Sequence, residues 1–155
     1  MTIRTMLTIV RGFGVVALVI TLSAGIGALT SELTGDSDGI EGGLRLHIVL
    51  GLSAGLFTLA AHAFFVFFLP RAALGLRSQG VEVPGWGRTV LLSVAAAAAT
   101  ILAVVFGVES MTESFRDDLH RLLSLAAVVL QMAALGAQTR ASAVLASAEA
   151  EDLKG

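Results

Sequence analysis

The chain contains three histidines and no cysteine, and each histidine lies in or beside a long apolar stretch. His47 and His62 lie within the run LRLHIVLGLSAGLFTLAAHAFFVFF, from Leu44 to Phe68, and His120 precedes another apolar run. Neutral imidazole binds haem iron, zinc and copper. The lack of cysteine excludes disulfides, thiolate metal sites, cysteine-ligated iron–sulfur clusters and thiol nucleophiles. Metal or cofactor binding by imidazole is therefore the first chemistry to consider.

The composition predicts that lipid surrounds these histidines. Of the 155 residues, 55% are hydrophobic and only 14% are charged, whereas a soluble domain has about a quarter charged residues. A helix needs about 20 apolar residues to cross a bilayer, and four stretches approach that length: 13–30, 46–69, 90–108 and 122–137. We expect an all-α integral membrane protein, an up-down-up-down bundle of four transmembrane helices over 1–137, and a cytoplasmic helical tail at 138–155. The net charge of -2 gives no indication of nucleic-acid binding.

The segments between these stretches differ in charge. Seven of the ten basic residues lie in the N-terminal segment, the 70–89 connection and the tail: Arg4, Arg11, Arg71, Arg77, Arg88, Arg140 and Lys154. Eight of the twelve acidic residues lie in the other two connections: Glu32, Asp36, Asp38, Glu41, Glu109, Glu113, Asp117 and Asp118. The positive-inside rule then predicts cytoplasmic termini, with a bacterial inner membrane as the expected location. Pro70 is expected to end the second helix, and Trp86 to anchor the cytoplasmic interface.

The two halves of the chain resemble each other. The sequence LHIVLGLSAGLFTLAA from Leu46 aligns with LHRLLSLAAVVLQMAA from Leu119, and the two Leu-His pairs coincide. This pattern suggests a tandem duplication of a two-helix hairpin. In an up-down-up-down bundle, the second and fourth helices would then be parallel and diagonally opposed.

Small and polar residues mark one face of each of these two helices. On the second helix the face contains His47, Gly51, Ala54, Thr58 and His62. On the fourth helix it contains His120, Ser124, Ala127, Gln131 and Gln138. Small and polar side chains let membrane helices approach and hydrogen-bond, while bulky apolar side chains face lipid. The three histidines are therefore expected to point into the bundle.

His47 and His120 would lie at equal depth on diagonal helices, as axial ligation of one haem from both sides requires. The glycines that would leave room for a porphyrin are Gly25, Gly51 and Gly107, and the arginines that could pair with its propionates are Arg45 and Arg121. This arrangement is similar to that of b-type membrane cytochromes, including the cytochrome b subunits of quinol-oxidising complexes. The resemblance implies one haem b near the outer face and electron transfer to or from a quinone or a partner protein.

His62 lies too far from His47 to share that site, roughly 22 Å along the helix at 1.5 Å per residue. We expect it to be a neutral hydrogen-bond partner between helices, bonded to Thr100, Ser93 or a glutamine. Two other interpretations of the whole chain remain open. One is a cofactor-free accessory or assembly subunit that binds other membrane subunits or itself. The other is an outward-facing metal site formed by His47, His120 and Asp117. No residue is predicted to be catalytic.

Overall fold

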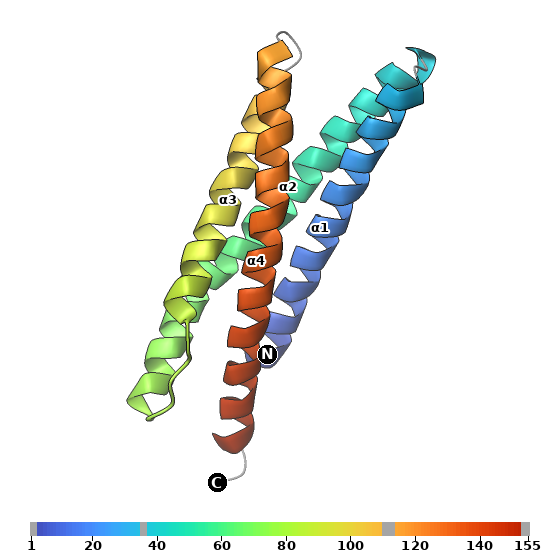
Figure 1. Ribbon diagram of the computed structural model, residues 1–155. Helices are drawn as coiled ribbons and strands as arrows, with labels where there is room; N and C mark the ends of the chain where they lie inside the picture. Colours follow the sequence, from blue (N-terminus) through green and yellow to red (C-terminus); the bar gives the residue numbers. More distant parts are fainter. Residues whose placement is uncertain (1–2, 35–36, 110–113, 153–155) are drawn as a thin grey trace.

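In the computed structural model, the described residues form four α-helices (Figure 1). Consecutive helices run in opposite directions, so the chain passes up and down the bundle twice. The structure describes residues 3–34, 37–109 and 114–152, although several side chains, including those of Arg11 and Thr21 and all those at 31–47, lie outside the description. The helices are α1, Ile3–Thr34; α2, Ser37–Ser78; α3, Trp86–Glu109; and α4, Ser114–Asp152.

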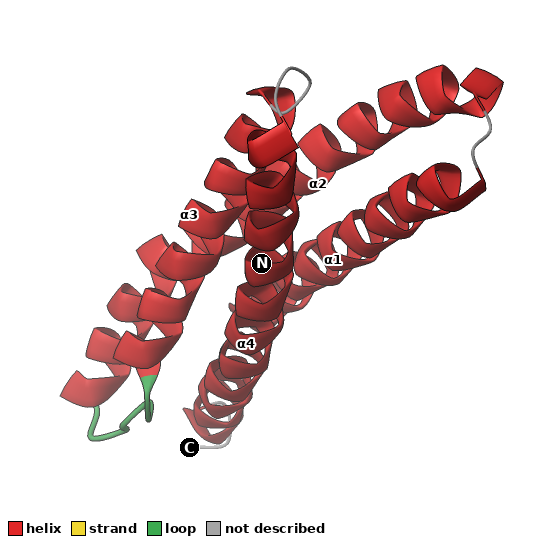
Figure 2. Cartoon of the chain, turned by 45° about the horizontal axis from the view of Figure 1, so that its top comes forward, coloured by secondary structure: helices red, strands yellow, loops and turns green. Residues whose placement is uncertain are grey.

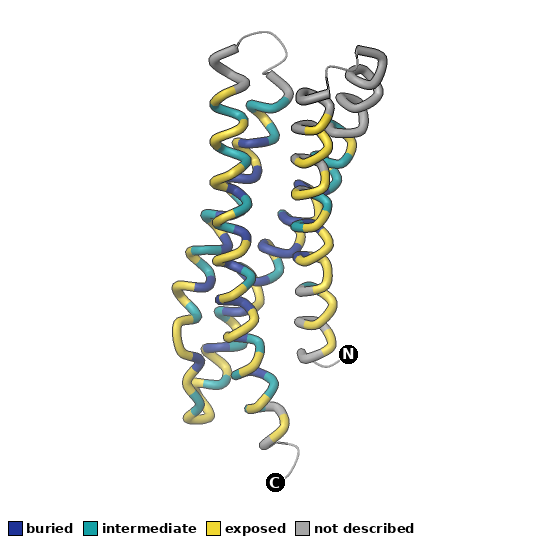
Figure 3. Tube along the Cα trace, turned by 45° about the vertical axis from the view of Figure 1, so that its right-hand side comes forward, coloured by how far each residue is buried: buried dark blue, intermediate teal, exposed yellow. Residues whose placement is uncertain are grey.

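Three of these helices are long and apolar enough to cross a membrane: α2 over Ile48–Ser78, α3 over Trp86–Gly107 and α4 over Asp118–Ala148. The first helix, α1, contributes a shorter apolar stretch, Thr8–Ile20. Figure 3 shows exposed residues along the outward faces of all four helices. Many are large and apolar, as expected of helices that face lipid. At this level the prediction of an all-helical, membrane-type bundle is confirmed.

Neighbouring helices in the sequence are also neighbours in the bundle, and α4 also packs against α1. Across the diagonals, α2 and α4 touch over a short length, whereas the described parts of α1 and α3 are not in contact. At the end where α1 connects to α2, this hairpin diverges from the α3–α4 hairpin (Figures 1 and 2). The bundle is therefore tightest in its middle and near the α2–α3 connection.

The largest buried apolar cluster lies toward the α2–α3 connection. It joins α2, the connection and α4 through Phe65, Leu69, Ala73, Val83, Ala141 and Leu145. A second cluster between α3 and α4 consists of Ala99, Ala103 and Ala127. Small side chains let these helices approach closely. No helix break separates residue 137 from residue 138, because α4 continues to Asp152 and its later turns contribute to the larger core cluster.

The prediction that Pro70 ends the second helix is wrong: Pro70 lies inside α2, which continues to Ser78. A proline removes one backbone donor, which membrane helices tolerate where neighbouring groups compensate. The helix ends instead at Ser78, two residues before Gly80, whose φ of 82° is left-handed. The backbone N–H of Gly80 donates to Arg77 and that of Val81 to Leu76, at 3.1 and 2.9 Å. This is the Schellman pattern, in which glycine is favoured.

Candidate functional site

A buried polar cluster joins α2, α3 and α4. The side chain of Gln138, only 1% exposed, places its Nε2 at 2.9 Å from Oγ of Ser93 and 3.1 Å from Nδ1 of His62. With the amide nitrogen as donor, Nδ1 of His62 is the acceptor and the ring is neutral. The prediction that His62 is a hydrogen-bond partner between helices is confirmed. Its partner is Gln138, which also binds Ser93.

One of the two polar atoms of the Gln138 amide has no hydrogen-bond partner among the described residues. This atom, Oε1, is buried. Rotating the amide by 180° would place Oε1 against Ser93 and His62 and leave Nε2 buried instead. A buried polar atom without a partner costs about 1–3 kcal/mol. The polar cluster is therefore incomplete in either orientation of the amide.

A second polar contact lies two turns away along α4. Nε2 of Gln131 donates to Oγ1 of Thr100 at 3.1 Å, and this contact joins α4 to α3. Between this pair and the His62 cluster lies a small cavity of about 10 Å³, which is enough for one water molecule. Its wall is formed by α1, α2 and α4 through Gly14, Thr58, Ala61, His62, Gln131 and Leu135.

The imidazole of His120 lies against α3 near the α3–α4 connection. Its Nδ1 is 2.8 Å from the carbonyl oxygen of Ala103. Because a carbonyl only accepts, Nδ1 carries the hydrogen, and in the neutral ring Nε2 carries the lone pair. A Cβ at Gly107 would lie 2.7 Å from Cε1 and 2.9 Å from Nδ1 of this ring. Glycine at this position therefore lets the imidazole reach the backbone of α3.

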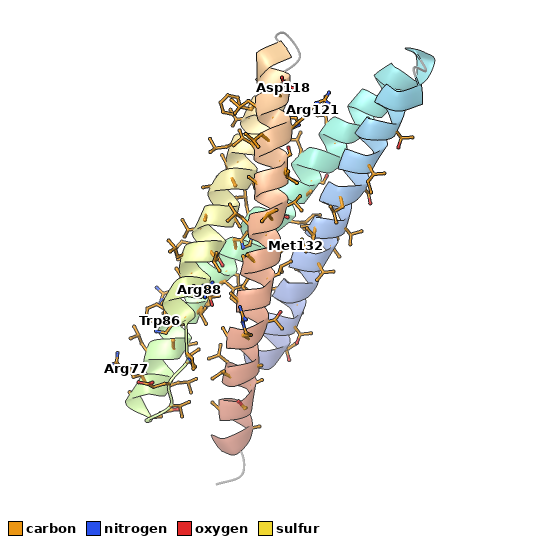
Figure 4. All side chains as sticks on the ribbon, viewed as in Figure 1. Arg77, Trp86, Arg88, Asp118, Arg121 and Met132 are labelled. Carbon is orange, nitrogen blue, oxygen red and sulfur yellow. The ribbon has the colours of Figure 1, made fainter. Side chains whose placement is uncertain are left out.

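The structure describes only some of the residues predicted to bind a cofactor. The side chains of Arg45, His47 and Asp117 and the surroundings of Gly25 lie outside the described residues, although their helices are placed. On α2, Gly51 is half-buried, and a Cβ there would meet no atom within 4 Å. On α4, Arg121 is exposed near Asp118, at the end that connects to α3 (Figure 4).

These placements separate His62 from His120. His120 contacts Gly107, and its ring occupies the space beside this glycine. His62 belongs to the distant cluster with Gln138. The described side chains form no group of three or more histidine, aspartate or glutamate residues that could hold a metal ion. The predicted metal site of His47, His120 and Asp117 includes residues outside the description.

The basic residues of the 70–89 connection lie at the opposite end of the bundle from Arg121. Figure 4 shows Arg77, Trp86 and Arg88 there. Trp86 is half-buried and packs against the apolar cluster of Phe65 and its neighbours. It therefore contributes to the core as well as lying at the end of the apolar span. Arg77 and Arg88 are exposed.

Sequence reasoning identified the polar faces but not the central role of Gln138. Gln131 and Gln138 are seven residues apart, a spacing that places both on one helix face. That spacing could have predicted that both glutamines contact the same neighbouring helix, two turns apart. Their partners Thr100 and Ser93 could not be predicted, because they depend on how the helices pack. In comparisons with known proteins, no family model, no curated protein and no solved structure matches the chain.

Proposed function

We propose that this protein is a small b-type membrane cytochrome with His47 and His120 as the axial ligands of one haem. The observation that carries the proposal is the contact between Nδ1 of His120 and the carbonyl of Ala103. Proteins commonly orient a ligating imidazole through this kind of hydrogen bond, which fixes the tautomer of the ring. The hydrogen bonds of Gln131 and Gln138 do not orient the imidazole of His120, so they do not support this haem site.

The surrounding residues support the same site. His47 is on the first half of α2 and His120 on the first half of α4, two helices that run in the same direction and face each other diagonally. Gly51 adds no side chain to the face one turn beyond His47. Arg45 and Arg121 would pair with the propionates.

Bound haem would supply one-electron transfer, and the chain would hold and insulate it. His47 and His120 fix the group, and the apolar spans keep it within the membrane. In this proposal both termini are cytoplasmic, the membrane is a bacterial inner membrane, and the haem lies near the outer face. A quinone or a partner protein would exchange electrons with it.

A second candidate function is that of a cofactor-free accessory or assembly subunit. The observation that favours it is that the side chains of His120, Gln131 and Gln138 on α4 each form a polar contact with another helix. In this interpretation the polar face only holds the bundle together, and the exposed apolar faces bind lipid or other subunits. The histidines would then carry no ligand.

A visible spectrum of the purified, detergent-solubilised protein distinguishes the two. The dithionite-reduced minus oxidised spectrum is expected to contain a sharp α-band that His47→Ala and His120→Ala abolish. His62→Gln serves as the matched control and should retain the band, because His62 belongs to another cluster. A colourless protein from haem-replete cells would reject the cytochrome in favour of the accessory subunit.

A further inference from the structure

Two of the three helices that line the cavity between α1, α2 and α4 contribute polar side chains to it. Thr58 and His62 contribute polar groups from α2, and Gln131 contributes one from α4. The third helix, α1, lines the cavity at Gly14, where a Cβ would lie 2.7 Å from Cδ2 of Leu135. Gly14 therefore lets α1 approach α4 closely at the edge of this cavity. Thr58, His62 and Gln131 are all at most 4% exposed.

Each of these three side chains has hydrogen-bonding capacity beyond the contacts already described. Gln131 uses Nε2 toward Thr100 and has a carbonyl oxygen in addition. His62 uses Nδ1 toward Gln138 and has a second ring nitrogen. Thr58 carries a hydroxyl that can donate one hydrogen bond and accept two. A buried site with these groups and room for one water molecule satisfies the conditions for an ordered ligand oxygen.

We propose that this cavity binds one hydroxyl oxygen held by Thr58, His62 and Gln131. Two sources have the same chemistry: a water molecule, or a hydroxyl group of a lipid-soluble quinol whose ring lies outside the cavity. In both cases the oxygen connects the Gln131–Thr100 pair to the His62–Gln138–Ser93 cluster. It also gives His62 a partner for proton exchange in the membrane interior. The site is independent of the proposed haem, because neither His47 nor His120 contributes to it.

The test uses the full chain in lipid nanodiscs with ¹⁵N-labelled histidine. Only three histidines are present, so His62→Gln and His120→Ala assign the spectrum. Magnetisation transfer from water to the His62 ring is expected in the wild-type protein and should fall at least twofold in Thr58→Val. Thr58→Ser, which retains the hydroxyl, should restore it. Thr89→Val is the matched control, because Thr89 is equally buried but bonds to Gly85 outside the cavity.

Addition of decylubiquinol distinguishes the two sources of the oxygen. If water is the ligand, the His62 signals do not change with decylubiquinol. If a quinol hydroxyl is the ligand, these signals shift saturably and the transfer from water decreases. The proposal is overturned if His62 receives no transfer and shows no shift, or if Thr58→Val transfers as efficiently as the wild type. Unchanged His120 signals would confirm that each variant is folded.

Discussion

At the scale of single residues, the contact between His120 and α3 depends on the absence of a side chain at Gly107. The imidazole lies where a Cβ would be, within 2.7–2.9 Å of that position. An alanine would therefore force the ring, or the whole of α4, away from the carbonyl of Ala103. The expected loss of stability on substitution of Gly107 by alanine comes from the clash with the ring. Helix propensity alone would favour alanine over glycine.

Gly107→Ala is expected to destabilise the protein by about 1–3 kcal/mol, the usual cost of overpacking. Reversible unfolding in mixed micelles measures the change. Gly136→Ala is the matched control, because Gly136 is exposed on α4 and a Cβ there meets no atom within 4 Å. The control should be neutral or more stable by up to about 1 kcal/mol. Equal effects of the two substitutions would contradict the described packing of His120.

The contact between His62 and Gln138 is the second residue-scale feature that can be measured. A double-mutant cycle with His62→Phe and Gln138→Leu should give a coupling energy of about 0.6 kcal/mol and at most about 1.7 kcal/mol, as for other hydrogen bonds between membrane helices. Ser147→Ala combined with His62→Phe is the control pair, because Ser147 is exposed and bonds within its own helix. A coupling energy of zero for the first pair would show that the two side chains do not interact.

At the scale of helices, the sequence predicted where apolar segments lie better than where helices end. Periodic small and polar residues correctly marked the buried faces of α2 and α4, including Thr58, His62, Gln131 and Gln138. The helix end predicted at Pro70 was wrong. The loss of one backbone N–H donor at the proline does not outweigh the packing of the following turns of α2. The pairing of Gln138 with Ser93 was not predictable, since it depends on how three helices pack in space.

Gly80 is the residue that sets the end of α2, so Gly80→Ala should be costly. Its φ of 82° requires a left-handed conformation, which costs a residue with a Cβ about 1–2 kcal/mol. Gly87→Ala is the control, because Gly87 lies in α3 and a Cβ there meets no atom within 4 Å. Unfolding measurements should separate the two variants by at least about 1 kcal/mol. A stable Gly80→Ala protein would imply a different connection.

At the scale of the whole molecule, the charge distribution and the antiparallel helices predict which ends share a side of the membrane. The chain contains no cysteine, so single cysteines can report accessibility without background. Gln79→Cys and Ser147→Cys should react with an impermeant maleimide only after the cells are opened. Asp118→Cys should react in intact spheroplasts. Reaction of all three from the same side would contradict the membrane topology.

The spin state of the oxidised protein tests the proposed cytochrome most directly. Two imidazoles bound to ferric haem give a low-spin iron, because both axial ligands are strong. Electron paramagnetic resonance of the purified protein should therefore contain one low-spin ferric signal per chain, and His120→Ala should convert it to a high-spin signal or remove it. If no ferric haem signal is present, or if the low-spin signal survives in His120→Ala, His47 and His120 do not hold a haem.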